Sequence, residues 1–292
     1  MTIIESDPKA RRNYIRKLLS NASIEALPAQ VITTPEIVQP LPSAPVFVPF
    51  LPGSDLDSTI IATRNLVSMG REVVPHLPAR SFQSRDHLSD WLAAIRSTDT
   101  KHLLLIAGDT QFPLGPFKDT LDVIDTGLIE QHDIERVFIA GHPEGHPLVA
   151  PKVLYDALTV KHAWSEAMSI ELHVVTQFTF DIPQFINWLD QVNQITNSIP
   201  VHLGIAGPAS PASLAKYALQ CGVSLSGKMM LSNRSARKLL TQWNPSALIE
   251  DLMRFYPVSR PAAIHIFPFG GISKTSEWIK KMTLFPKAKP VY

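Results

Sequence analysis

Residues Arg136–Pro147, RVFIAGHPEGHP, pass within a few positions from an apolar run to a polar loop. The run Val137–Ala140 contains β-branched and aromatic side chains, as buried strands do. It stops at the loop Gly141–Pro147, which holds two histidines, a glutamate, two prolines and two glycines. This pattern indicates a buried strand that presents polar side chains at its C-terminal end.

Seven further apolar segments have the same character and alternate with segments of helical periodicity. The strand-like segments are residues 22–28, 46–48, 72–76, 102–107, 172–178, 201–205 and 263–267. Helices are expected over residues 8–20, 54–69, 84–96, 120–131, 151–168, 183–196, 210–221 and 273–284, with two helical segments over roughly 234–255 and an extended loop over residues 29–45. Strands that alternate with helices in this way form parallel sheets buried on both faces.

Eight strand–helix units predict an α/β protein whose single domain is a (β/α)8 TIM barrel. We expect the domain to span residues 1–292, with residues 1–20 as an N-terminal helical extension. An open, doubly wound sheet is the competing arrangement, and the spacing alone does not exclude it. No G-x-G-x-x-G motif follows the first strand, which counts against that arrangement.

The composition argues against several classes of partner. A formal net charge of +1 over 292 residues gives no electrostatic basis for binding nucleic acid or an anionic membrane. No apolar run approaches the roughly 20 residues of a transmembrane helix, and the mixed-charge N-terminus is not a signal peptide. A single cysteine, Cys221, permits no internal disulfide. We expect a cytoplasmic protein, although a cysteine-poor exported protein would look similar. The sequence leaves a homo-oligomer open.

Polar residues gather where the predicted strands end. They are Glu25, His76, Asp109, His142, Glu144, His146, Gln177 and Asp181. In a barrel the C-terminal strand ends meet at one mouth, which is the active face. Structural interpretations exist too: Glu25 could belong to a salt bridge, Gly108-Asp109 is a common turn dipeptide, and Gln177 could be a satisfied interior amide. Their shared location favours a functional site.

The two histidines of the opening loop raise the question of a metal. His142 and His146 are four positions apart, as in helical zinc motifs. Pro143 and Gly145 disfavour a helix there, so the two imidazoles need not share a face. We therefore expect no metal site, and a metal-dependent barrel hydrolase is kept only as a minor alternative.

Five motifs follow one another along the chain. They are IEALP at Ile24–Pro28, PHL at Pro75–Leu77, AGD at Ala107–Asp109, HPEGHP at His142–Pro147 and VTQFTFD at Val175–Asp181. In this order, and above all in the last two, the chain resembles the methylenetetrahydrofolate reductase family between about residues 20 and 270. The resemblance implies a (β/α)8 flavoprotein oxidoreductase of one-carbon metabolism and methionine biosynthesis, with FAD at the barrel mouth.

The resemblance also implies a reaction. NADH or NADPH gives a hydride to FAD, which passes it to 5,10-methylenetetrahydrofolate to form 5-methyltetrahydrofolate. The sequence sets neither the physiological direction nor the choice of nicotinamide cofactor. The tetrahydrofolate derivative is the small-molecule partner that we expect.

Roles for individual residues follow from the same resemblance. Glu25 corresponds to the general acid, which protonates the folate so that its five-membered ring opens to a reactive iminium. This requires a carboxyl that is protonated near neutral pH, and a desolvated site provides one by raising its pKa. Asp109 corresponds to an aspartate beside the flavin and the pterin, and Gln177 to a glutamine that hydrogen-bonds the pterin. FAD contacts are implied for His76, Gly108, Asp109, His142, His146, Asp156 and Lys161.

The chain departs from the family pattern at several places. Ala107 stands where many relatives have an arginine before Gly-Asp, and His142 stands where a tyrosine is frequent. No phenylalanine near residues 208–213 matches the one that stacks on substrate in relatives, and a late family arginine near residues 269–271 is missing. These departures motivate a second hypothesis, a divergent paralogue that binds folate and lacks independent catalysis.

Overall fold

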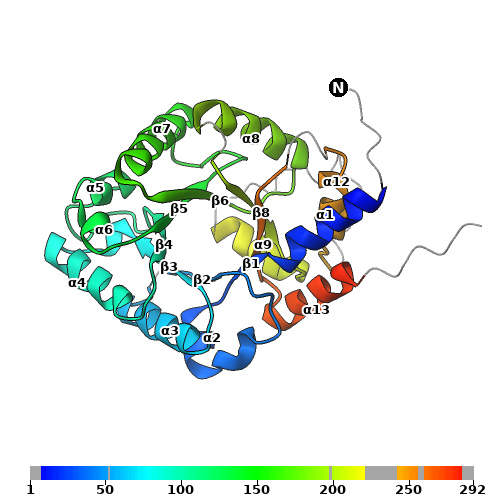
Figure 1. The fold of residues 1–292 in the computed structure, drawn as a ribbon, viewed down its shortest axis with the longest axis horizontal. Helices are drawn as coiled ribbons and strands as arrows, with labels where there is room; N and C mark the ends of the chain where they lie inside the picture. The colour runs from blue at the N-terminus through cyan, green and yellow to red at the C-terminus, as the bar shows by residue number, and fades with distance from the viewer. Residues whose placement is uncertain (1–7, 52, 197–198, 221–241, 256–259, 285–292) are drawn as a thin grey trace, which may run out of the picture.

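The computed structural model describes residues 8–51, 53–196, 199–220, 242–255 and 260–284, and it shows a closed barrel of parallel strands (Figure 1). The strands are β1 (Ser23–Glu25), β2 (Val46–Val48), β3 (Val73–Pro78), β4 (His102–Ile106), β5 (Arg136–Gly141), β6 (Glu171–Thr176), β7 (Val201–Ala206) and β8 (Ala263–Phe267). They follow chain order around the barrel, and β8 pairs with β1 through Ser23–His265 and Ile24–Ile266. The predicted (β/α)8 barrel is confirmed, and the open sheet is excluded.

Helices surround the barrel (Figure 1). They are α1 (Pro8–Ser20), α2 (Pro28–Thr33), α3 (Leu56–Ser68), α4 (Arg85–Arg96), α5 (Thr120–Ile124), α6 (Leu128–Gln131), α7 (Pro151–Met168), α8 (Ile182–Thr196), α9 (Pro211–Gln220), α12 (Ser246–Leu252) and α13 (Ile272–Thr283), with 3-10 turns η1 (Pro35–Val38) and η2 (Ala79–Ser81). Side chains fix several helix starts. Asp55 accepts a hydrogen bond from Ser58 N at 2.6 Å, and Ser84 accepts one from His87 N at 3.1 Å.

Two sequence expectations about helices are wrong. Residues 29–45 are not an extended loop, because Pro28 and Pro35 begin α2 and η1. Proline suits the first helical position, where its missing N–H needs no partner. The expected helix over residues 120–131 is split into α5 and α6 because Gly127 between them adopts a positive φ of 67°. Of the helical segments expected over residues 234–255, residues 234–241 lie outside the described residues.

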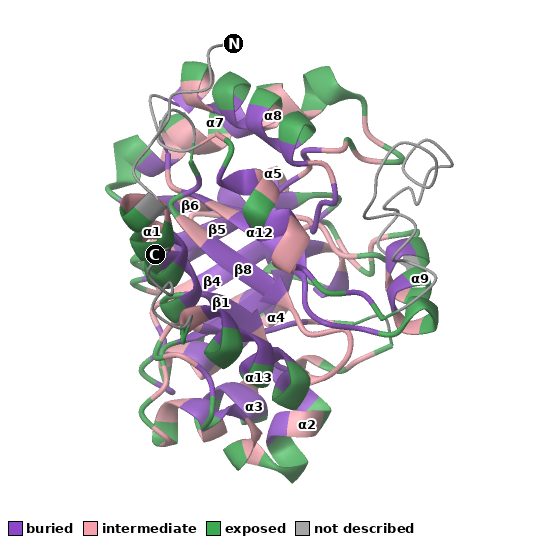
Figure 2. Cartoon of the chain, turned by 90° about the vertical axis from the view of Figure 1, so that its right-hand side faces the viewer, coloured by how far each residue is buried: buried purple, intermediate pink, exposed green. Residues whose placement is uncertain are grey.

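Burial on both faces of the strands holds the barrel together. Alternate strand residues point into the barrel lumen or toward the helices. Phe47, Val74, Leu104, Phe138 and Val175 pack together inside the lumen. Their strand neighbours pack outward in the large core that includes the helices. Figure 2 accordingly shows buried strands at the centre and exposed outer helix faces.

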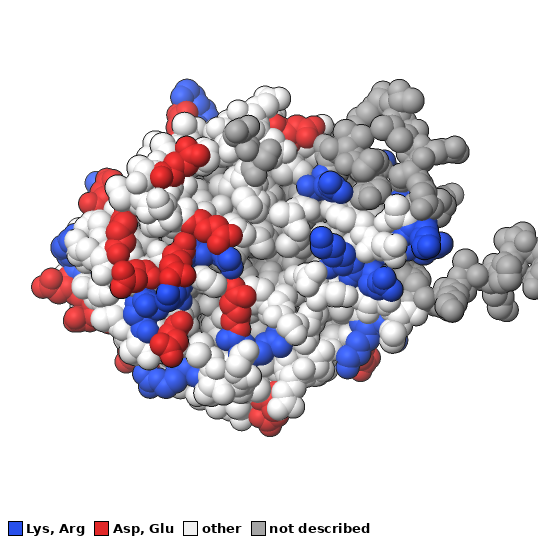
Figure 3. All heavy atoms as spheres, in the orientation of Figure 1, with Lys and Arg blue, Asp and Glu red and all other residues white. Residues whose placement is uncertain are grey.

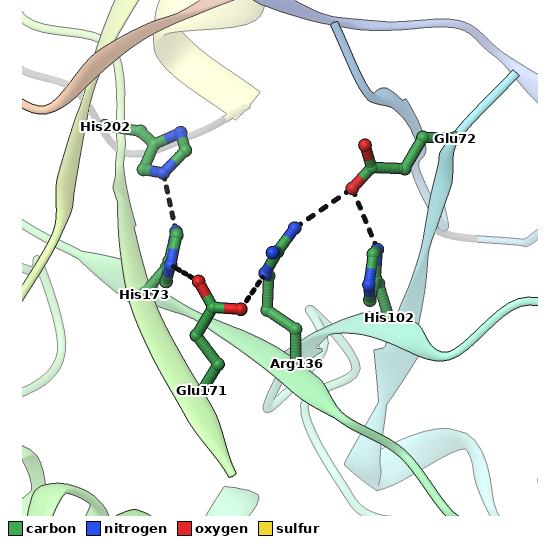
Figure 4. Close-up of polar contacts among 6 residues, drawn as sticks. All are labelled: Glu72, His102, Arg136, Glu171, His173 and His202. Atoms are coloured by element: carbon green, nitrogen blue, oxygen red, sulfur yellow. Dashed lines mark hydrogen bonds and ion pairs between the residues drawn. The ribbon is translucent and has the colours of Figure 1, made fainter.

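The N-terminal end of the lumen carries a polar network, the floor network (Figure 4). Its members are Glu72, His102, Arg136, Glu171, His173 and His202. Arg136 donates to Glu72 at 3.0 Å and to Glu171 at 2.7 Å. His173 Nε2 lies 2.7 Å from Glu171, and His173 Nδ1 lies 2.9 Å from His202 Nε2. The carboxylates and the guanidinium of this network therefore each have an opposite charge in contact with them.

Opposite charges also lie together on the surface. Figure 3 shows acidic side chains gathered beside basic ones on the left of the face drawn. This mixing agrees with the formal net charge of +1. Within the described ranges, no helix combines the length and apolar character needed to span a bilayer.

Candidate functional site

Glu25 ends β1, and its carboxyl lies inside the barrel between two imidazoles. Glu25 Oε1 is 3.8 Å from Nε2 of His76 on β3 and 3.8 Å from Nε2 of His265 on β8. The Glu25 side chain is only 17% exposed. Ser23 fixes His265, because its hydroxyl lies 2.9 Å from Nδ1. The Phe47 ring packs edge-on against both imidazoles.

Burial sets the protonation states of these groups. It raises the pKa of Glu25, and the nearby His76 opposes that shift. Burial also lowers the pKa of His76 to about 4 and the pKa of His265 to about 3. Neither Nε2 atom has a hydrogen-bond partner among the described residues. The site thus combines a carboxyl whose pKa is raised by burial with two imidazoles that are neutral near pH 7, an arrangement suited to donating a proton.

The loop that opened the sequence analysis is fixed against its neighbours. Gly141 ends β5 where a Cβ would lie 2.7 Å from Val174 Cγ1, so a larger residue does not fit. Glu144 accepts hydrogen bonds from the Thr179 hydroxyl at 2.6 Å and from Phe180 N at 3.0 Å. These bonds join the loop after β5 to the loop after β6. Glu144 therefore has a structural role in the candidate site.

The two histidines of this loop lie side by side at the mouth. Their rings meet edge to face with centroids 5.0 Å apart. Burial, helped by His146 and Lys161, lowers the pKa of His142 to about 4. Burial also lowers the pKa of His146, which the Asp109 carboxylate opposes. The pKa of Lys161 falls to about 8 because the ammonium is desolvated. Two neutral imidazoles and one poorly solvated cation therefore line this side of the mouth.

Gly108, Asp109 and Gln177 occupy neighbouring strand ends. Gly108 follows β4 with a φ of 91°, a conformation that L side chains rarely adopt. Asp109 comes next and is close enough to act electrostatically on His146. Gln177 follows β6; its backbone N–H donates to Gly141 O at 2.8 Å, and its Oε1 accepts from Phe178 N at 3.0 Å. The side-chain NH2 is left as the donor end of the amide.

Two of the strand-end and helix residues are engaged in local structure. Asp156 pairs with Lys152 on α7 at 2.6 Å, with a side chain that is 61% exposed. The structure does not bring Asp156 into contact with the histidines of the loop. Asp181 accepts a hydrogen bond from Gln184 N at 2.9 Å at the start of α8. Asp181 therefore acts as a helix-capping residue.

Sequence reasoning missed two features of the mouth. His265 is flanked by Ile264 and Ile266, and the period-two alternation alone could have placed its side chain in the lumen. The rings of Tyr217 on α9 and Phe269 after β8 stack with centroids 4.3 Å apart and planes 11° apart. No local sequence pattern predicts that pair, because its members come from different segments.

No group of three metal-ligating side chains suited to a metal ion occurs in the part of the chain that the structure describes.

Fold and site together define a (β/α)8 barrel with a buried carboxyl between two imidazoles at its mouth. A model of the family described as methylenetetrahydrofolate reductase matches residues 46–237, about two thirds of the chain. The chain belongs to the methylenetetrahydrofolate reductase family, which confirms the predicted resemblance. Membership supports a folate-related, reductase-like role for an oxidoreductase. His76, Asp109 and Gln177 lie inside the matched range, whereas Glu25 and His265 lie outside it.

Solved structures with a similar course of the chain are distant. Tryptophan synthase from M. tuberculosis has 12% identity and a TM-score of 0.48, covering 94% of this chain and 96% of that one. The tryptophan synthase alpha-subunit from Pyrococcus furiosus has 11% identity and a TM-score of 0.47, covering 90% and 96%. Dihydropteroate synthase from Thermus thermophilus has 9% identity and a TM-score of 0.47, covering 90% and 93%. At this distance they give no information about activity.

Proposed function

We propose that this protein is a flavin-dependent methylenetetrahydrofolate reductase that interconverts 5,10-methylenetetrahydrofolate and 5-methyltetrahydrofolate with NAD(P)H. One observation carries the proposal beyond family membership. The Glu25 carboxyl lies in the lumen between the neutral imidazoles of His76 and His265, where burial raises its pKa. Reduction of the methylene group consumes one hydride and one proton, and a protonated, desolvated carboxyl is a suitable source of that proton.

The residues at the mouth fit a flavin dinucleotide. Gly108 would bring backbone close to a planar ring, because it carries no side chain and its φ of 91° turns the chain sharply after β4. His142 offers neutral ring nitrogens, and Lys161 offers a cation for phosphate. His146 Nδ1 accepts the Leu148 N–H, which leaves its Nε2–H as a donor. When bound, FAD supplies the transfer of a hydride from NAD(P)H to the folate.

The protein's own contribution is orientation and control of one proton. Glu25 gives its proton to a nitrogen of the substrate's five-membered ring, so that the ring opens to the iminium that accepts the hydride. Burial lowers the pKa values of His76 and His265, which limits how far His76 can offset the raised pKa of Glu25 before the transfer. The Gln177 amide, fixed through Phe178 N, presents its NH2 to the pterin. Asp109, which acts on His146, would lie beside the flavin and the pterin. FAD contact by Asp156 is the weakest of these assignments because its carboxylate is engaged with Lys152.

The test is a comparison of wild type with Glu25→Gln in flavin binding and in turnover. We expect the wild type to bind FAD, to be reduced by NADH or NADPH, and to reduce methylenetetrahydrofolate. Glu25→Gln should lose about 10²- to 10⁴-fold in folate turnover, the usual contribution of general acid catalysis, with unchanged FAD affinity. Glu135→Gln, at an exposed position directly before β5, is the matched control and should behave as wild type.

Each alternative has its own outcome. A protein that acquires no flavin absorbance on addition of FAD is not a flavoprotein, and the proposal then fails. Folate binding without reduction of bound flavin by either nicotinamide cofactor identifies the non-catalytic paralogue instead. Normal folate turnover in Glu25→Gln removes this residue from the acid role.

A further inference from the structure

Arg80 lies at the barrel mouth and is held in place by the loop that follows β4. It belongs to η2, directly after β3. Its backbone N–H donates to Ala107 O at 2.9 Å. Its Nε donates to Lys118 O at 2.6 Å and its Nη1 to Thr110 O at 3.2 Å. A guanidinium carries five N–H donors, so three remain beyond these two side-chain bonds.

The Arg80 guanidinium has no carboxylate in contact with it among the described residues. This distinguishes it from Arg136 in the floor network, which contacts Glu72 and Glu171. A half-buried cation is costly to desolvate unless an anion or several acceptors compensate it. Two carbonyl oxygens compensate Arg80 only in part. The two hydrogen bonds therefore fix the orientation of the guanidinium, which can still bind an anion.

Arg80 lies at one end of a row of nitrogen-containing side chains. The positive charge of Arg80 acts on His146. The His146 ring lies 5.0 Å from the ring of His142, centroid to centroid. Lys161 in turn acts on His142. Lys161 likewise has no ion pair in the described part of the chain, because Asp119, the carboxylate that influences it, accepts the Leu121 N–H at the start of α5. Two cations thus lie at either end of a pair of neutral imidazoles.

We propose that Arg80 and Lys161 bind the two ends of a dinucleotide diphosphate. The hydrogen bond from Arg80 N to Ala107 O at 2.9 Å holds η2 beside the segment that follows β4. Arginine binds phosphate oxygens through paired N–H donors, and its fixed plane lowers the entropy lost on binding. The inference rests on the proposed function, which makes FAD the dinucleotide concerned.

The experiment measures the affinity of purified wild type, Arg80→Met and Arg71→Met for FAD, riboflavin and NADH. Arg71 is the matched control, because its guanidinium also donates to two backbone carbonyls, those of Pro42 and Ala44, but it lies before β3 at the other end of the barrel. Loss of one charge-assisted contact should weaken FAD binding by about 10- to 100-fold in Arg80→Met. Riboflavin, which has no diphosphate, should bind all three proteins equally.

The outcomes separate this inference from the proposed function. Equal loss of FAD and riboflavin affinity in Arg80→Met would mean that Arg80 only supports the loop, and it would overturn the inference. Unchanged FAD affinity would do the same, and weaker binding of NADH alone would assign the diphosphate to the nicotinamide cofactor instead. If the wild type binds no flavin, the proposed function fails. Inorganic pyrophosphate then decides about Arg80: weaker binding by Arg80→Met than by Arg71→Met supports the anion site, and equal binding refutes it.

Discussion

Acid should weaken the fold through His202, which is neutral inside the barrel floor. Burial is the main reason that the pKa of His202 falls to about 3, and His173 and His265 add to the effect. In an unfolded chain the imidazole has a pKa of about 6.5. The folded pKa is the lower one, so the unfolded state binds the proton first as the pH falls. Stability from this residue is therefore complete above about pH 6.5 and is lost progressively toward pH 3.

The size of the effect follows from how far the pH lies below the pKa of His202 in the unfolded chain. At about pH 5 the difference is about 1.5 units, which corresponds to about 2 kcal/mol of lost unfolding free energy at 1.36 kcal/mol per unit. His202→Gln cannot titrate, and its amide can still face His173. The pKa values of Glu72 and Glu171 are lowered from 4.5, so their contributions are lost only at lower pH. The change between about pH 7 and pH 5 in wild type should therefore exceed that in His202→Gln by about 2 kcal/mol.

Urea unfolding followed by tryptophan fluorescence tests this at a series of pH values. The other buried histidines of the lumen, His76 and His265, are present in both proteins and cancel in the comparison. Above about pH 7 the two stability curves should run parallel, because His202 is neutral in both the folded and the unfolded state. The reasoning is refuted if the two proteins lose the same stability, within about 0.5 kcal/mol, between pH 7 and pH 5.

Three further substitutions test close packing, backbone conformation and helix capping. Gly204→Ala should lower the unfolding free energy by about 3 kcal/mol, because the new Cβ would lie 2.2 Å from Thr176 O. Gly70→Ala should lower it by only about 1 kcal/mol in the same urea titration, because the Cβ meets no atom within 4 Å and only the φ of 74° is unfavourable. Equal losses would contradict the steric explanation. Asp55→Ala should cost about 1 kcal/mol by removing the cap on Ser58 N, and an unchanged urea midpoint would show that the cap does not contribute.

The barrel could be predicted because its signals are local. Each strand is a short apolar run, and each helix between them has its own periodicity, so the alternation is visible without any knowledge of contacts. Pro28 and Pro35 mislead the prediction because proline marks both loops and helix starts. The deciding factor is the burial of Val31 and Val38, which depends on the rest of the fold.

The sequence predicted only those residues of the candidate site that lie at the ends of predicted strands. Glu25 and His76 come together as their positions at predicted strand ends suggest. His265 lies in the same place but sits within an apolar strand, where it looks like a core residue. Asp156 shows a different limit, because a position transferred along α7 says nothing about which partner its carboxylate finds, which here is Lys152. Arg80 joins the site through contacts with a loop thirty residues away, which only the fold brings near.

The two ends of the lumen differ in whether their charged side chains contact opposite charges within the chain. At the floor, Arg136 has Glu72 and Glu171, so that end needs no ligand to be stable. At the mouth, Arg80 and Lys161 lack contacting carboxylates in the described residues, and the Glu25 carboxyl has only neutral imidazoles beside it. Uncompensated groups of this kind are costly unless a ligand completes them. The same residue types therefore compensate one another at the floor and lack contacting opposite charges at the mouth, which is where we propose that an anionic ligand binds.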